Sequence, residues 1–195
     1  MSVLDQKITA MDVWHAQLPV KTRRDHGIGT VADNIDVVIV RLTCESGEQG
    51  FGEASPWSVF TGTAEGNFAA LNRYIRPLVV GRTLRDLQSI MIAADHVVVH
   101  CGEAKAALET ALLDLKGRLL GVPIYELLGG RVRETIPLSV SLANPDFEAD
   151  IALVEQLKAD GVRLVKFKTG IKDHAFDVMR VERPVSYTHL TLPTI

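Results

Sequence analysis

The sequence predicts an α+β unit over residues 1–130, followed by the start of a β/α unit over residues 131–183. Three strand-like segments come first, about three segments with a helical period follow, and a strand–helix–strand succession begins after Arg133. An α+β fold separates its strands from its helices, whereas strict alternation favours parallel strands with a helical crossover. We therefore expect two architectures in this chain of 195 residues.

The three strand-like segments are expected to form a small antiparallel meander. Residues 8–17 are mostly apolar, residues 36–44 are rich in β-branched side chains, and residues 50–53 follow a Ser-Gly turn at hairpin distance. The connecting segments 20–34 and 54–62 contain glycine or proline and many polar residues. We expect both of them to be long, shaped loops.

From Thr63 onward the apolar residues recur at helical spacing. A first helix is expected to end before Pro77, and Thr83 is expected to cap a second one. The clearest helix covers residues 103–119 and is stopped by the glycine and proline that follow it. Its apolar stripe consists of Ala104, Ala107, Leu108, Ala111, Leu112, Leu115 and Leu119.

The later part of the chain is typical of a βαβ unit. Strands are expected at residues 136–143 and 162–168, with a helix at residues 145–160 between them. Asn144 is the expected N-cap, because Pro145 would then occupy the first helical position, where its missing N–H is not needed. A further helix is expected to begin near Asp173.

The end of the chain departs from this pattern. Residues 184–195 contain no Asp, Glu, Lys or Arg, and Pro184 is expected to break the helix that precedes it. The segment resembles translated sequencing adapter of the kind found in assembled metagenomic genes. We therefore expect residues 184–195 to be a non-native tail, and a native but unusual C-terminus is the alternative.

The composition is that of an ordinary globular protein. Hydrophobic residues make up 47% of the chain, charged residues 23%, and the formal net charge is −3, which excludes a disordered chain and gives no sign of nucleic-acid binding. No stretch approaches the roughly 18 apolar residues of a membrane span, and the first ten residues lack the apolar core of a secretory signal. We expect a cytoplasmic protein with no nucleic-acid or membrane partner.

The two cysteines do not indicate a metal site. Cys44 and Cys101 lie far apart, and neither belongs to a Cys-x-x-Cys pair. We expect both to be buried, reduced thiols.

Lys166 and Lys168 are the most informative pair of candidate functional residues. Side chains two positions apart on a strand project to the same face, so both ammonium groups leave the carboxyl end of the second strand of the βαβ unit together. In a β/α barrel that end carries the active site. Two such charges disfavour each other's protonation, which favours a lysine that acts as a base. The alternative is an exposed edge strand with two solvated lysines.

A second motif, over residues 27–32, matches the pattern Gly-x-Gly-x-x-Ala of dinucleotide-binding turns. The residues before it are polar and charged rather than an apolar strand, so a flexible loop is the better interpretation. His26 could contact a substrate anion from this loop, and a solvated surface histidine is the alternative.

Four motifs together resemble the enolase superfamily, and within it the muconate cycloisomerase (muconate-lactonizing) subgroup of mandelate racemase-like proteins. They are Gly50–Glu53, Ala106–Gly117, Gly121–Gly130 and Lys166–Lys168, and the resemblance covers residues 1–183. It implies an α+β capping domain over residues 1–130, followed by the start of a TIM-type (β/α) barrel over residues 131–183. It also implies an enzyme that abstracts a proton next to a carboxylate, or forms the related enolate by addition, with Mg²⁺ or Mn²⁺ holding the enolate.

The resemblance also assigns roles to residues. Lys168 resembles the acid/base lysine of the subgroup, and Lys166 resembles its neighbour, which tunes it and contacts the substrate carboxylate. Residues 20–30, with His26 and Ile28, resemble the first specificity loop, and residues 54–60, with Trp57, resemble the second. Ser141 lies at the end of the first barrel strand and could reach the substrate, although an ordinary strand-end serine is an equal alternative.

The chain departs from the family in what it lacks. The acidic metal ligands and the opposing lysine come from later barrel strands, and a barrel needs eight strand–helix units, of which this chain supplies two. We therefore expect a truncated, inactive chain with no metal ligands of its own, for which Glu182 is no substitute.

For the parent protein we expect a muconate-type cycloisomerase that acts on a small carboxylate and forms a homo-oligomer when it is full length. The nearest alternative is an epimerase or racemase of dipeptides or N-acylamino acids. A third alternative, from a different class, is a non-catalytic α+β interaction module.

Overall fold

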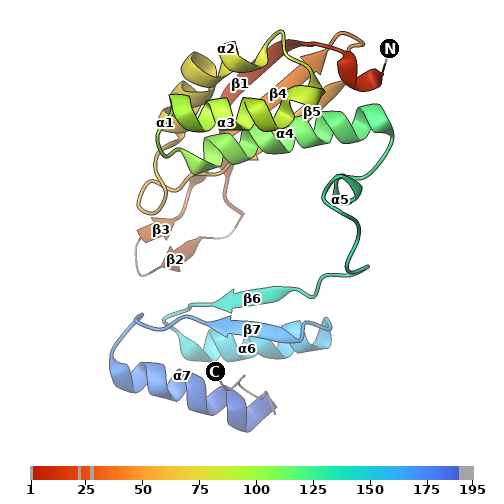
Figure 1. Ribbon diagram of the computed structural model, residues 1–195. Coiled ribbons are helices and arrows are strands. Elements are labelled where there is room, and N and C mark those ends of the chain that lie inside the picture. Colours follow the sequence, from red (N-terminus) through yellow and green to blue (C-terminus); the bar gives the residue numbers. More distant parts are fainter. Residues whose placement is uncertain (1, 22, 27–28, 189–195) are drawn as a thin grey trace. The chain divides into compact units, whose positions relative to one another are not determined.

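The computed structural model describes residues 2–21, 23–26 and 29–188. The chain divides into two compact units, one formed by residues 1–21 and 33–132 and the other by residues 22–32 and 133–195. Figure 1 shows the helices and strands of both units.

The first unit is built on a three-stranded antiparallel sheet in the order β1-β4-β5. The strands are β1 (Ile8–Pro19), β4 (Asn34–Cys44) and β5 (Gln49–Ala54), and a short 3₁₀ turn, η1 (Val3–Asp5), precedes them. Val40 lies in the middle of the sheet, where it pairs with Val13 on one side and with Gly52 on the other. The predicted meander is confirmed.

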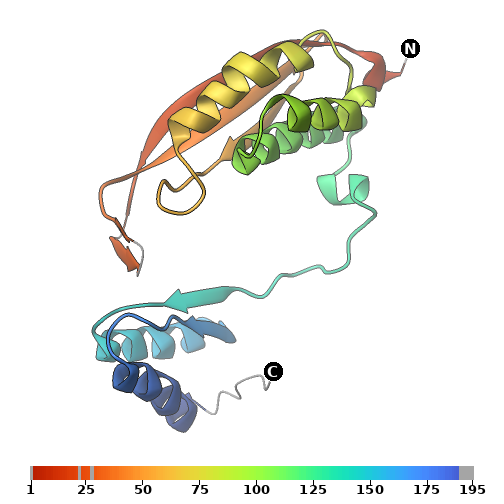
Figure 2. The same ribbon diagram turned by 60° about the vertical axis from the view of Figure 1, so that its left-hand side comes forward.

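Helices cover one face of this sheet, as Figures 1 and 2 both show. On this face the side chains of the strands are buried against the helices, in one continuous apolar core. The helical segments are α1 (Ala64–Ala69), η2 (Ala70–Ile75), α2 (Arg76–Val79), η3 (Leu84–Asp86), α3 (Leu87–Val97), α4 (Gly102–Leu120) and α5 (Ile124–Leu127).

The sequence predicts that the first helical segment ends before Pro77. In the structure this segment continues to Val79. The reason is a π-helical stretch, η2, in which the Arg76 N–H bonds to the Leu71 carbonyl five residues earlier. Pro77 then lies at the second position of α2, directly after the π-helical stretch. The widened turn lets the chain stay helical through a proline.

Helix α4 confirms the predicted apolar stripe. Six of its seven members are fully buried, and Leu119, near the end of the helix, is partly buried. Gly121 follows with a φ of 68°, the left-handed conformation that ends many helices. The alanines of the stripe bring α4 close to β5, where Gly50 and Gly52 have no side chains to hold it away.

The second unit contains a βαβ unit with parallel strands, as predicted. Strand β6 (Ser139–Leu142) pairs with β7 (Leu164–Phe167), and α6 (Phe147–Ala159) connects them. Helix α7 (His174–Thr188) follows. The expectation that Pro184 breaks this helix is wrong, since the backbone stays helical to Thr188; losing one backbone hydrogen bond does not by itself end a helix.

Two further expectations need correction. The N-cap of α6 is Asp146 rather than Asn144, because the Asp146 carboxylate accepts the Glu148 N–H at 3.1 Å, while Asn144 accepts the Asp146 N–H in the preceding turn. The expected loop at residues 20–34 contains an antiparallel hairpin of β2 (Arg24–His26) and β3 (Gly29–Val31).

None of the helices in the described part of the chain is long and apolar enough to cross a membrane.

Candidate active site

The carboxyl ends of β6 and β7 bring three of the predicted site residues together. Ser141 and Lys166 are direct partners across the parallel ladder. Lys168 follows the last residue of β7, and its backbone N–H donates to the Leu142 carbonyl at 3.0 Å. Lys166 and Ser141 are exposed and Lys168 is half-buried. A hydroxyl and two ammonium groups therefore lie at one end of two parallel strands, where they could bind and protonate an anion.

Phe167 separates the two lysines and lies on the other side of the strand. Alternation along a strand sends its ring away from the face that Lys166 and Lys168 share. The ring lies 5.7 Å from the guanidinium carbon of Arg180 in α7. The strand thus shows its lysines on one face and is held by α7 on the other.

Arg180, whose side chain is fully buried, is not among the residues predicted from the sequence. Its guanidinium donates to the Leu142 and Asn144 carbonyls, each at 3.0 Å, and to the Asp150 carboxylate at 2.7 Å. Burial raises the pKa of Asp150, against the lowering effects of the Asn144 N–H and Arg180. An arginine at a helical position gives no sequence signal of burial, so only the pairing with Asp150 could have suggested it.

The remaining predicted site residues lie elsewhere in the chain. His26 is in β2, opposite Gly29, and Ile28 lies outside the described residues. Trp57 belongs to the first unit and is half-buried. Its carbonyl accepts the N–H groups of Phe60, Thr61 and Gly62, which folds this part of the predicted loop into a compact turn.

The donor set does not fit a divalent cation. Among the residues that the structure describes, no three His, Cys, Asp or Glu side chains come together as a metal ion would need. Mg²⁺ prefers several oxygen ligands in near-octahedral geometry. A set of three such ligands for Mg²⁺ or Mn²⁺ is therefore not found among the described residues.

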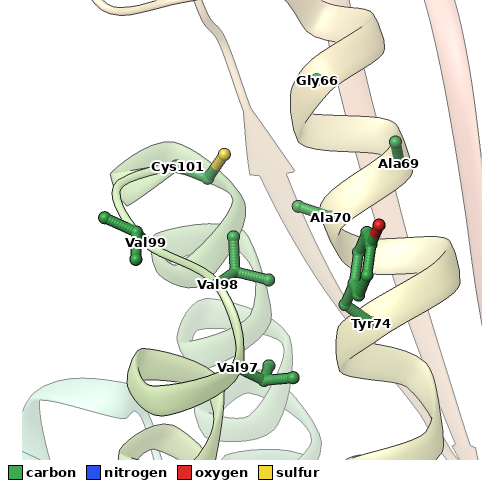
Figure 3. A pocket seen from close by; sticks show the side chains of 8 residues that line it. All are labelled: Gly66, Ala69, Ala70, Tyr74, Val97, Val98, Val99 and Cys101. Atoms are coloured by element: carbon green, nitrogen blue, oxygen red, sulfur yellow. The ribbon is translucent and has the colours of Figure 1, made fainter.

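A hollow of ≈ 400 Å³ lies in the first unit, between helical residues 66–74 and the segment 97–101 (Figure 3). Its walls are mostly apolar, with the Tyr74 hydroxyl and the Cys101 thiol as side-chain polar groups. Cys101 is half-buried and Cys44 is buried, and both are free thiols. No charged side chain lines the hollow, so a small carboxylate would find no counter-charge there.

Comparison with known proteins decides the family. Residues 6–129 match the profile described as "Mandelate racemase / muconate lactonizing enzyme, N-terminal domain". The chain belongs to this family. The enolase-superfamily resemblance and the fold class, an α+β capping domain followed by the first part of a barrel, are therefore confirmed.

Relatives of this mandelate racemase / muconate lactonizing family member carry out different reactions. The chain is 32% identical over 171 residues to the L-Ala-D/L-Glu epimerase of Clostridium acetobutylicum, covering 87% of this chain and 47% of the epimerase. It is 36% identical over 149 residues to muconate cycloisomerase 1-1 of Acinetobacter lwoffii, covering 74% and 39%.

A solved structure extends the likeness beyond the N-terminal domain. The crystal structure of a muconate cycloisomerase from Azorhizobium caulinodans matches with a TM-score of 0.77 and 36% identity, covering 93% of this chain and 46% of that one. This family member thus spans about half the length of the curated relatives it matches.

Proposed function

We propose that this chain is part of a metal-dependent enzyme of the enolase superfamily, a muconate-type cycloisomerase that acts next to a substrate carboxylate through an enolate. The observation that carries the proposal is the placement of Lys166 and Lys168 beside Ser141, at the carboxyl ends of β6 and β7. The family match and the cycloisomerase relatives support it.

In this proposal the two lysines have different tasks. Lys168, fixed by its backbone bond to Leu142, donates a proton to or removes one from the carbon next to the carboxylate. Lys166 is exposed on the same face, where its ammonium group binds the substrate carboxylate. The Ser141 hydroxyl, on the neighbouring strand, is placed to donate a hydrogen bond to the same anion.

A divalent metal ion, when bound, would stabilise the negative charge of the enolate. Since the described residues do not form a site for it, its ligands would come from residues other than these. The tasks assigned to Lys166, Lys168 and Ser141 do not depend on where those ligands lie.

A second candidate function is epimerisation or racemisation of dipeptides or N-acylamino acids. The observation that favours it is the similarity to an L-Ala-D/L-Glu epimerase over 87% of this chain. Both reactions use a proton-transfer group next to a carboxylate, so the geometry of the lysines suits either. A non-catalytic interaction module is the third candidate, and absence of metal-dependent turnover would favour it.

One experiment separates these functions. The full-length protein that carries this sequence is incubated with Mg²⁺ in D₂O, once with a diene dicarboxylate and once with a set of dipeptides and N-acylamino acids. The cycloisomerase converts the diene to a lactone, with loss of its ultraviolet absorption. An epimerase instead incorporates deuterium at the α-carbon of product or of unreacted substrate. Turnover of neither class would contradict both enzymatic proposals.

A further inference from the structure

We propose that Arg180 is a positioning residue for the Lys166–Lys168 pair, and that it acts through the backbone and the ring on the opposite side of β7. The inference rests on the proposed function of the two lysines. Arg180 does not belong to their face of the strand, so it is not a catalytic residue.

The first contact is a shared carbonyl. The Leu142 carbonyl accepts both the Lys168 N–H and the Arg180 Nη2, each at 3.0 Å. Lys168 lies one residue past the end of β7, so this bond is the backbone link that ties it to β6. A displacement of Leu142 would therefore move Lys168 with it.

The second contact fixes the chain that follows β6. Arg180 Nη1 donates to the Asn144 carbonyl, and Asp150 accepts both the Asn144 N–H and the Arg180 guanidinium. Arg180 thus binds the carbonyls of Leu142 and Asn144, while Asp150 binds the Asn144 N–H. A planar guanidinium can make these bonds at once, whereas an ammonium group is a point charge that cannot span them.

The third contact is aromatic. The guanidinium carbon of Arg180 lies 5.7 Å from the centre of the Phe167 ring, between the two lysines in sequence, and 5.9 and 5.4 Å from the rings of Phe147 and Phe176. Cation–π attraction acts at this range and strengthens when the cation is desolvated. Arg180 therefore holds both the residue between the lysines and the carbonyl that binds Lys168.

The test compares Arg180→Lys with Arg183→Lys, the same change one turn along α7 at a residue that pairs with Glu148. In the 195-residue chain, amide hydrogen exchange is measured at Lys168 and, as a reference, at Val154 in the interior of α6. We expect exchange at Lys168 to become about tenfold faster in Arg180→Lys, because a charge-assisted hydrogen bond to Leu142 is lost. Val154 should change less than about twofold. Arg183→Lys should leave both unchanged.

In the full-length protein, Arg180→Lys should lower kcat about tenfold or more with KM nearly unchanged, since a small misplacement of a proton-transfer group slows the chemical step. If Arg180→Lys does not fold, the pair Arg180→Met with Asp150→Asn takes its place, because it leaves no buried unpaired charge.

Equal loss of exchange protection at Lys168 and Val154 in Arg180→Lys would mean that Arg180 has a purely structural role, and it would overturn the inference. Unchanged exchange at Lys168 together with an unchanged kcat would overturn it as well. Failure of the proposed function gives a different result. In that case Lys168→Ala keeps its turnover, whatever the exchange at Lys168 shows.

Discussion

Gly52 of β5 lies directly against the backbone of Ala107 in α4. A Cβ atom built on Gly52 would lie 1.9 Å from the Ala107 carbonyl oxygen, and one built on Gly50 would lie 2.4 Å from the Ala111 carbonyl oxygen. Both contacts are with backbone, which cannot rotate away. The two glycines of the Gly-Phe-Gly-Glu motif are therefore a packing requirement of the sheet and α4.

Gly52→Ala should lower the free energy of unfolding by about 3 kcal/mol, at the upper end of the usual cost of overpacking, because strand and helix must separate. Chemical denaturation measures the loss. Gly102→Ala is the matched control, because a Cβ there has no atom within 4 Å. Equal stability of the two variants would contradict the close packing of β5 and α4.

The sequence was informative where a physical pattern is local and repeated. The stripe of α4 and the alternation of β4 follow from burial of one face, so their elements and core residues could be predicted. The hairpin of β2 and β3 could not, since strands of three residues, one of them Arg24–His26, have no room for alternation. The π-helical turn before Pro77 is a tertiary adjustment with no local signature.

The candidate site shows the same division. Lys166 and Lys168 could be proposed as candidates because their spacing on a strand has a geometric meaning, and Ser141 because it lies near the end of the neighbouring strand. Arg180 could not, because its burial depends on Asp150, thirty positions earlier in the chain, and on rings from other elements. Long-range pairing of this kind leaves no periodic trace in a single sequence.

Asp86 should make the first unit sensitive to acid. A hydrogen bond from Arg82, with a further one from the Thr83 N–H, lowers the pKa of the Asp86 carboxyl from 3.8 to about 2. A carboxyl with a lowered folded-state pKa contributes stability above pH 3.8 and loses it as the pH falls toward about 2.

Asp86→Asn should therefore be less stable than the parent chain at pH 6, by about 0.5 kcal/mol, because solvent screens this 36%-exposed side chain. The difference should shrink as the pH falls below 3.8. Urea denaturation at a series of pH values measures it, with Glu109→Gln, at an exposed carboxylate of α4, as the control. A difference that does not depend on pH would contradict the role of ionised Asp86.

Deleting residues 184–195 should change the melting temperature by less than about 2 °C. Arg180 and Arg183, which connect α7 to α6, precede the cut and keep their partners Asp150 and Glu148. Deleting residues 180–195 instead should cause a clear loss, because it leaves Asp150 buried without its arginine. A loss of several degrees from the shorter deletion would mean that the last twelve residues are packed and native.

Mg²⁺ should not bind this 195-residue chain at a stoichiometric, micromolar site. Among the described residues, no three potential ligand side chains come together. Mg²⁺ loses its bound water reluctantly, so fewer than three protein ligands give it little reason to leave water. Isothermal titration calorimetry measures binding directly. A one-to-one micromolar site in this chain would mean that the metal ligands are among its own residues. The proposal that the ligands come from residues other than the described ones would then be wrong.

Lys168→Ala in the full-length protein is the variant that shows whether the lysine whose backbone N–H binds Leu142, at the end of β7, transfers the proton. Lys172→Ala, which removes a lysine lying over the Phe176 ring, is the matched control. A third variant, Lys166→Ala, should retain measurable turnover. We expect kcat to fall on the order of 10² or more in Lys168→Ala and to stay near the parent value in Lys172→Ala. Parent-level turnover by Lys168→Ala on every candidate substrate would contradict it, and the two lysines would then be the solvated side chains of an ordinary strand end.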